Sequence, residues 1–545
     1  MAQITPEFQD AMNRNPRLKT YISNLKDIPI PTFTAQLNRD MKHEDFPNYI
    51  YPVGDPIFIH AYKKRGEGMF WQAIEPELNE KEKEFYEEVS DKLIAIAHML
   101  PSESESEELT NILSKLLNNA CEVEGVSSDQ LGEKYSEVSV TKKIKVNLQE
   151  YQNLKYMMIR DRAGYGYLEP LLRDPYIEDI HVTGVGRVYM VHKIFDVCPT
   201  SIVFENDMVL DRYVFDASER VERPVSVARP VIDAVMPDGS RVNFIYGREI
   251  SLEGTSFTIR KFAKIPVSIT QLISWNTGAA KNAAYLWLCL ENGMSLFVCG
   301  ETASGKTTTL NAICAFIRPD AKIFTVENTP EVTMPHEIWQ HLLTREAGRD
   351  TDIKEFTLLK AALRSRPNYI IVGEIRGAEG AVAFQAMQTG HSTMATFHAG
   401  SVHQMIQRLI GDPINVPIAF IDNLNVVLIQ QAVYHNGRFI RRILSITELT
   451  KYYDELNKVG SSQVFQWDPV KDEHIFRGFH NSFVLEEKIA KQLGYEDPRE
   501  IYNELDKRER ILTKMVDEKI FNYFDVWKVI KAYREDGEKG LPFTI

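Results

Sequence analysis

The segment 300–307 carries residue types that bind phosphate. It reads Gly300-Glu-Thr-Ala-Ser-Gly305-Lys306-Thr307 and matches G-x-x-x-x-G-K-[ST] at every fixed position. The two glycines allow the backbone to curl so that several N–H groups meet one phosphate, and the helix start behind them adds its positive dipole end. Lys306 supplies a cation to the β- and γ-phosphates, and the Thr307 hydroxyl is a Mg²⁺ ligand. This pattern predicts a site for ATP and Mg²⁺. The predicted nucleotide-binding residues are Gly300, Glu301, Thr302, Ala303, Ser304, Gly305, Lys306, Thr307 and Thr308.

A second candidate lies at the end of the apolar run 369–374. This run ends in Gly373-Glu374, where the magnesium-side residue of phosphate-loop enzymes is usually Asp. We therefore expect Glu374 to hold Mg²⁺ through water or to order the attacking water. We also expect this strand to lie directly beside the strand that precedes the phosphate loop.

Further polar residues surround these two motifs. Glu327 and Glu331 follow the apolar run 322–326, at the edge where open parallel sheets place ligands, so either could be a general base. On residue chemistry alone, this stretch is equally consistent with a plain turn. Arg376 follows Glu374 and is a candidate for stabilising phosphate charge. His391 and His398 flank a short predicted strand and could sense phosphate, since the charge of a histidine is easily tuned.

The pattern of apolar and polar residues along the chain indicates which helices and strands position these residues. From about residue 270, strand-like runs alternate with helical segments, which predicts a parallel α/β sheet with crossover helices and, near residues 498–520, C-terminal helices. Upstream, residues 165–262 hold short strand-like runs and turn residues that favour an α+β domain. We predict an N-terminal extension (1–40), a first α+β region (41–150), a second α+β domain (151–262), a linker (263–269) and an ATPase domain (270–545).

Composition excludes several classes of function. The chain has 545 residues and a net charge of −13, which argues against a nucleic-acid protein held by phosphate neutralisation. Its five cysteines form no C-x-x-C pair, so we expect reduced thiols and no zinc site. The N-terminus lacks an apolar core segment, and no apolar run reaches the roughly 18 residues that indicate a membrane span. We expect a cytoplasmic protein.

The order of these motifs resembles the type II/type IV secretion ATPase superfamily. The matching pieces are the phosphate loop, the acidic box 327–331, the Gly-Glu strand end at 373–374, and the run Thr389-Gly-His391 to His398. The resemblance extends upstream to 166–180, to Pro237-Asp-Gly-Ser-Arg241 and to Thr258-Ile-Arg260. Segments 51–60 and 71–76 look like the archaeal branch, closest to the archaellum motor ATPase.

The resemblance implies a hexameric motor with a RecA-like domain. It implies that Glu331 is the catalytic glutamate and that Arg241 and Arg260 approach the phosphates from the N-terminal domain. The acidic box departs from the family pattern at Asn328, where Asp is common. The implied partners are five further copies of the chain and a polytopic membrane platform protein with other filament components. Nucleic acid is not among them, and contact with the inner face of the membrane would be peripheral and only through these partners.

Alternative functions remain open on the sequence. An archaeal type IV pilus or type II secretion ATPase would carry the same motifs. A RecA-like nucleic-acid translocase is disfavoured by the negative charge and by the lack of a basic patch with interleaved aromatics. A nucleotide-binding scaffold without turnover is disfavoured by the intact set of Lys306, Thr307, Glu331 and Glu374.

Overall fold

The computed structural model divides into two compact units, Met1–Phe262 and Ala263–Ile545. It describes residues 4–26, 28–38, 41–42, 44–64, 66–96, 106–126, 143–262, 265–345, 352–435 and 438–545. The predicted linker falls at the junction of the two units, and Ala263 and Lys264 lie outside the described residues. The remainder of that segment belongs to the second unit, because Val267 bridges to Asn522 and Ser268 caps the helix that follows.

The first unit is built on a ten-stranded sheet with the order β1-β2-β3-β4-β9-β8-β7-β12-β11-β10. Strands from regions 41–150 and 151–262 therefore lie in one sheet, joined where β4 pairs with β9 at Trp71 and Thr200. A separate small sheet pairs β5 with β6. The strands are β1 (Thr32–Phe33), β2 (Asn48–Pro52), β3 (Phe58–Lys63), β4 (Met69–Ile74), β5 (Cys121–Val123), β6 (Ile144–Val146), β7 (Ile177–Val182), β8 (Gly186–His192), β9 (Asp196–Phe204), β10 (Val231–Val235), β11 (Arg241–Ile245) and β12 (Ser256–Arg260). The helices are α1 (Pro6–Arg14), α2 (Pro16–Ser23), α3 (Glu80–Ile96), α4 (Ser106–Ala120), α5 (Leu148–Arg162), α6 (Glu169–Arg173) and α7 (Asp207–Arg220).

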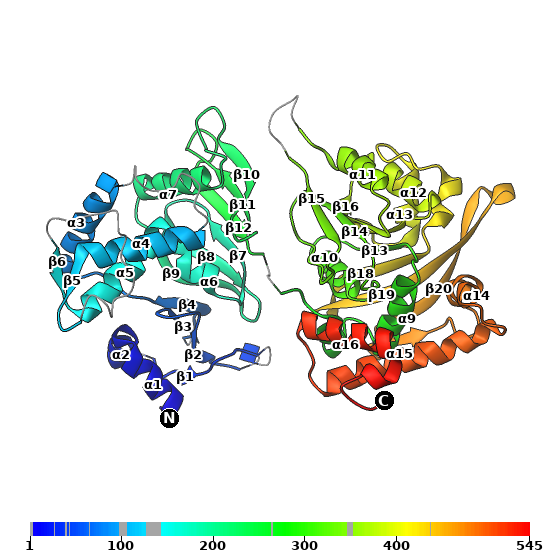
Figure 1. Ribbon diagram of the computed structural model, residues 1–545, viewed down its shortest axis with the longest axis horizontal. Coiled ribbons are helices and arrows are strands. Elements are labelled where there is room, and N and C mark those ends of the chain that lie inside the picture. Colours follow the sequence, from blue (N-terminus) through cyan, green and yellow to red (C-terminus); the bar gives the residue numbers. More distant parts are fainter. Residues whose placement is uncertain are drawn as a thin grey trace. The chain divides into compact units, whose positions relative to one another are not determined.

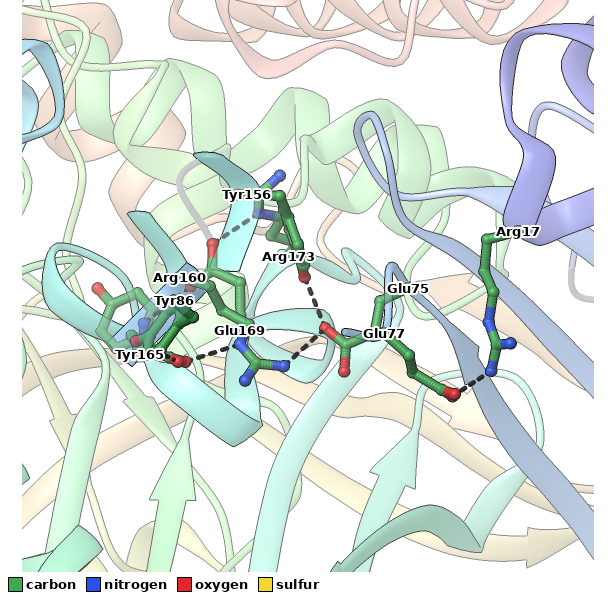
Figure 2. A network of polar contacts seen from close by, with 10 residues as sticks. Arg17, Glu75, Glu77, Tyr86, Tyr156, Arg160, Tyr165, Glu169 and Arg173 are labelled. Carbon is green, nitrogen blue, oxygen red and sulfur yellow. Dashed lines mark hydrogen bonds and ion pairs between the residues drawn. The ribbon is translucent and has the colours of Figure 1, made fainter. Parts of the chain in front are cut away.

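The N-terminal extension is part of the core of the first unit. Its helices begin at Thr5 and Asn15, whose side chains accept from the backbone N–H groups of Phe8 and Leu18, and each has Pro at its first position. The buried faces of these helices pack against strands β2, β3 and β4. The core residues of this contact are Phe8, Ala11, Met12, Leu18, Ile50, Phe58 and Ile74. Arg17 also pairs with Glu77 beyond the end of β4 (Figure 2).

Two carboxylates, one buried and one partly buried, tie the halves of the first unit together. Asp174 is fully buried and accepts from the Tyr51 hydroxyl at 2.8 Å and the Trp71 indole N–H at 2.9 Å. Glu75, after β4, accepts from the Tyr156 hydroxyl at 2.6 Å and from Arg160 on α5 (Figure 2). Because a buried carboxylate without partners is costly, these bonds fix α5 and the loop before β7 against β2 and β4.

The second unit is a nine-stranded sheet with the order β15-β14-β16-β17-β13-β18-β19-β20-β21. The strands from β15 to β18 are parallel, and β18 to β21 are antiparallel. One prediction was wrong: β17 lies between the phosphate-loop strand β13 and the Glu374 strand β16, so these two are not neighbours. The strands are β13 (Leu296–Cys299), β14 (Ile323–Glu327), β15 (Trp339–Leu343), β16 (Tyr369–Ile375), β17 (Ser392–Phe397), β18 (Val426–His435), β19 (Arg438–Tyr453), β20 (Lys458–Asp468) and β21 (Glu473–Phe476).

Helices cover both faces of this sheet (Figure 1). Alternate residues of β13 show the two faces, since Leu296 and Val298 join one core and Phe297 and Cys299 join the other. The first core holds residues of α8 (Ile269–Ser274), α9 (Ala280–Glu291), α10 (Lys306–Cys314), α15 (Ile501–Asp517), α16 (Tyr523–Asp536) and a π-helix at Phe483–Ala490. The short helix α14 (Lys491–Leu493) follows the π-helix and is exposed. The second core holds α11 (Glu355–Arg364), α12 (Glu379–Gln388) and α13 (Val402–Ile410). The three layers form the α/β fold that the alternating texture predicts.

Loss of the α2 contact should destabilise the first unit. Leu18→Ala removes a fully buried side chain and is expected to lower the free energy of unfolding by about 2–5 kcal/mol. Hydrogen exchange of peptides from β2 and β3 measures this local stability. Leu252→Ala, at a side chain that is 91% exposed, is the matched control and should stay within about 0.5 kcal/mol. Equal exchange in the two variants would show that the extension does not stabilise the sheet.

Candidate functional site

The predicted site residues of the second unit, apart from His391, meet at one edge of its sheet. Parallel pairing aligns the carboxyl ends of β13, β14, β16 and β17 at that edge. The phosphate loop follows β13, the acidic box follows β14, Glu374 closes β16 and His398 follows β17. This edge is where open α/β sheets bind ligands.

The phosphate loop is shaped by its glycines and by internal hydrogen bonds. Gly305 has φ of +90°, which a residue with a Cβ rarely adopts, and it leads into α10. A Cβ on Gly300 would lie 2.1 Å from the backbone oxygen of Gln430, so only glycine fits there. The Lys306 ammonium donates to the backbone oxygen of Glu301 at 2.8 Å, which folds this side chain back over the loop. Thr307 and Thr308 follow on the first turn of α10.

Side chains from β18 and β19 hold this loop, and the sequence motifs do not reveal them. The Gln430 amide donates to the backbone oxygen of Ser304 at 2.8 Å and accepts from the Thr309 hydroxyl at 2.6 Å. Arg441 donates from Nε to the backbone oxygen of Ala303 at 3.0 Å. Gln430 directly follows the apolar run Val426–Ile429 of β18 and is almost fully buried, so its only sequence signal is a polar residue at a core position.

Lys306 is the buried cation of the site. Burial lowers the pKa of its ammonium, while the nearby carboxylate of Glu374 acts in the opposite direction. Glu331 also interacts with this ammonium. A desolvated ammonium between carboxylates is well placed to exchange them for a phosphate anion.

Glu374 lies where the pairing of β16 and β17 is irregular. The register shifts between Val372 and Ile375, and such a bulge re-aims the residue that it contains. One carboxylate oxygen of Glu374 pairs with Arg376, and Oε1 lies 3.2 Å from His398 Nε2 without a hydrogen bond in the described part of the chain. Burial and the charge of Lys306 lower the pKa of His398. The structure thus brings Glu374, Arg376 and His398 together.

The donors at this edge fit a Mg²⁺ ion. The Thr307 hydroxyl and the Glu374 carboxylate are hard oxygen donors, and Glu374 Oε1 is buried without a hydrogen bond. Among the described residues, no cluster of His, Cys, Asp or Glu could hold a metal ion by itself. Mg²⁺ takes one or two protein ligands and completes its shell with phosphates and water.

The two glutamates of the acidic box have different surroundings. Glu327 is buried, and its Oε1 accepts from the backbone N–H groups of Glu331 at 3.0 Å and Val332 at 2.9 Å. The carboxylate of Glu331 makes no hydrogen bond or close ion pair among the residues that the structure describes, and it is half-buried. Asn328 accepts from the Thr344 hydroxyl at 2.9 Å, so this unusual residue also has a defined partner.

Steric crowding explains why a glycine, Gly373, precedes Glu374 near the end of β16. A Cβ on Gly373 would lie 3.1 Å from Cγ of Glu327, which is closer than side chains normally pack. The Glu327 side chain therefore lies across the position where other phosphate-loop enzymes carry Asp.

Three predicted residues lie outside the site just described: His391 is at the other end of β17, and Arg241 and Arg260 belong to the first unit. His391 precedes β17 and accepts or donates to the Thr389 hydroxyl at 3.1 Å, at the opposite end of that strand from His398. Arg241 and Arg260 belong to the first unit, where they are directly opposite each other on β11 and β12. Both are exposed, and Arg260 lies 3.1 Å from Asp179 on β7.

A hollow of about 570 Å³ opens beside the phosphate loop. Its lining joins the start of the loop to the segment after β17 and to α13. The lining residues are Gly300, Glu301, Thr302, His398, Ala399, Gly400, Gln404, Gln407 and Arg408. Most of these groups are polar, as expected of a site for a polyphosphate.

Fold and site define an α/β domain with a phosphate loop at the carboxyl edge of its parallel strands. Residues 161–466 match the family described as "Type II/IV secretion system protein", which is more than half of the chain. The chain belongs to this family. Among the described residues, each helix is too short or too polar to cross a bilayer.

Individual proteins and solved structures are similar to all or part of this chain. An uncharacterized protein of Methanocaldococcus jannaschii is 52% identical over 99% of this chain and 98% of its own length. The type IV secretion system protein PtlH of Bordetella pertussis is 32% identical over 34% of this chain and 62% of its own. The solved structure of the Legionella pneumophila ATPase DotB is 18% identical, with a TM-score of 0.38 over 67% of this chain and 94% of that protein.

Loss of the Gln430 amide should loosen the loop. Gln430→Leu leaves the Ser304 carbonyl and the Thr309 hydroxyl without partners, at a cost of about 1–3 kcal/mol. We expect Mg-ADP to bind about tenfold more weakly or worse, as measured by calorimetry. Gln431→Leu, next along the strand, is the matched control, because Gln431 contacts Gly400 at 3.4 Å and not the loop itself. Equal affinities would show that β18 does not support the loop.

Proposed function

We propose that this chain is an ATP-hydrolysing hexameric motor that drives assembly or rotation of an archaeal type IV pilus-like filament. Membership of the secretion family supports the general class. The observation that carries turnover is the pair of glutamates at and after the end of β14. Glu327 holds the loop, whereas the carboxylate of Glu331 makes no hydrogen bond among the described residues and interacts with the charge of Lys306. A scaffold without turnover would not need an unbonded carboxylate there.

The residues support a direct attack of water on the γ-phosphate. Backbone N–H groups of the loop and the Lys306 ammonium hold the β- and γ-phosphates. Glu331 accepts the proton as the water oxygen bonds to the γ-phosphorus and the bond to the β–γ bridging oxygen breaks, which gives ADP and phosphate. Glu374 orders water at the same edge, and Arg376 and His398 adjoin that carboxylate, so loss of the γ-phosphate changes their common partner. When bound at Thr307 and Glu374, Mg²⁺ neutralises phosphate charge.

Arg241 and Arg260 are proposed to complete the site from the first unit. Directly opposite like charges on neighbouring strands are unfavourable, and Asp179, 3.1 Å from Arg260, offsets part of this charge, so a further anion beside the exposed Arg241 is favourable. Triphosphate is such an anion, and arginines of this kind contribute about 10³–10⁵ in rate in other NTPases. This scheme gives His391 no role at the phosphate loop of its own unit. Phosphate sensing is proposed for His398 alone.

The filament and its membrane partners are the finer part of the proposal. The full-length relative from an archaeon supports the archaeal branch, and the N-terminal extension and C-terminal helices favour an archaellum motor over a pilus or type II secretion ATPase. Such a motor works at the cytoplasmic face of the membrane, on a polytopic platform protein. The net charge of −13 disfavours nucleic acid as the track and suits basic cytoplasmic loops of that partner.

Glu331→Gln tests the catalytic assignment. The amide keeps the shape of the side chain but cannot accept the proton of water, so we expect kcat to fall at least about 100-fold. Affinity for Mg-ATP should stay within about threefold, because the residue does not hold the phosphates. Steady-state phosphate release and equilibrium nucleotide binding measure the two effects together.

Two variants complete that experiment. Glu337→Gln, at an exposed glutamate of the same connection, should hydrolyse ATP normally, whereas Lys306→Ala should lose nucleotide binding and turnover together. Normal hydrolysis by Glu331→Gln with an inactive Glu374→Gln would transfer the role of base to Glu374. ATP turnover by Lys306→Ala above about a tenth of the wild-type kcat would contradict the assignment of the loop.

Assembly should control turnover. The proposed arginines and the phosphate loop lie in different units, so the site is completed only when the two units move together. In a ring of subunits, such a movement in one subunit is transmitted to its neighbour. Specific ATPase activity should rise with protein concentration until sedimentation velocity shows hexamers. Constant specific activity from nanomolar concentration upward, with a monomer in sedimentation, would contradict a ring motor.

A further inference from the structure

The backbone around Glu331 is held on two sides by side chains. From β14, Glu327 Oε1 accepts the N–H groups of Glu331 and Val332. From α10, the Asn311 amide donates to the backbone oxygen of Glu331 at 2.7 Å and accepts from the N–H of Thr333 at 2.9 Å. Buried backbone groups that would otherwise need water are thereby satisfied. The position of the Glu331 carboxylate depends on where Glu327 and Asn311 are held.

Glu327 is itself held by a residue outside every motif. Its second oxygen, Oε2, lies 2.7 Å from Nε2 of His341 on β15, the strand next to β14 in the sheet (Figure 1). Both atoms are buried, and neither has a hydrogen-bond partner among the described residues, so each is the other's polar neighbour. A buried carboxylate oxygen facing a buried ring nitrogen fixes the rotation of the carboxylate, and with it the direction of Oε1.

The imidazole of His341 has its own support. Its ring stacks on Trp339 of the same strand, with centroids 5.1 Å apart and planes at 23°. The Trp339 indole donates to the Thr325 hydroxyl on β14 at 3.0 Å. A chain of contacts therefore runs from Trp339 through His341 and Glu327 to the backbone of Glu331.

We propose that His341 is a positioning residue for ATP hydrolysis, acting on Glu331 through the buried carboxylate of Glu327. The assignment rests on the proposed function, because it assumes that Glu331 is the base. Its physical basis is that a displacement of about 1 Å in a catalytic group costs about 10²-fold in rate. The phosphate loop itself is held by Gln430 and Arg441 and does not use this chain of contacts.

Two substitutions distinguish the role of the His341 ring nitrogen that faces Glu327 from the role of the aromatic ring itself. His341→Phe keeps an aromatic ring for Trp339 and removes the nitrogen that faces Glu327, so kcat should fall at least about tenfold. His341→Gln removes the ring but places an amide N–H at similar reach, so kcat should stay within about threefold of wild type. The KM for ATP and the affinity for Mg-ADP should stay within about twofold in both, because the phosphate contacts are unchanged. Rates are expressed per nucleotide-binding site, titrated with Mg-ADP.

A double-mutant cycle tests the route through Glu327. If His341 acts only on that carboxylate, Glu327→Gln with His341→Phe should turn over at the rate of Glu327→Gln alone, within about twofold. If the rate losses of Glu327→Gln and His341→Phe instead multiply in the double variant, His341 does not act through Glu327. Normal kcat in His341→Phe, a slower His341→Gln than His341→Phe, or loss of nucleotide binding in His341→Phe would each overturn the assignment to His341. Absence of ATP turnover by the wild-type chain would overturn the proposed function itself, and the positioning role with it.

Discussion

Parallel pairing of β13, β14, β16 and β17 is the constraint on which the candidate site depends. Residues that are far apart in the sequence meet only because these four strands end at one edge. The crossover helices bury both faces of these strands, which is why the strands are nearly continuous apolar runs. A polar side chain at the end of such a strand therefore either hydrogen-bonds to a neighbouring residue or can bind a ligand. The site contains side chains of both kinds.

Buried polar side chains convert this scaffold into a defined geometry. Gln430 bonds to the phosphate loop and to the first turn of α10, Asn311 bonds from the same helix to the acidic-box loop, and Glu327 bonds to that loop from the sheet. Loops of this kind have few regular backbone bonds of their own, so side chains must supply them. Since Asn311 and Lys306 belong to one helix, the phosphate-binding and acidic-box loops form one connected body.

Much of this arrangement was predictable from local sequence. The phosphate loop, the alternating strands and helices, and a helix after residue 498 follow from fixed motifs and periodicity, and the structure has all three. The strand order was not predictable, because apolar runs do not specify which neighbour they pair with, and β17 between β13 and β16 illustrates this. Gln430, Arg441 and His341 escaped notice because their roles arise from contacts with residues far along the chain.

The fit between Glu327 and Gly373 has an evolutionary consequence. A Cβ at position 373 would lie 3.1 Å from Cγ of Glu327, so the Glu327 side chain must shift by a few tenths of an ångström before residue 373 can carry a side chain. A relative with Asp at 373 is therefore expected to place its residue 327 differently and to brace its acidic-box loop by other means. A change at one of these positions should favour a compensating change at the other.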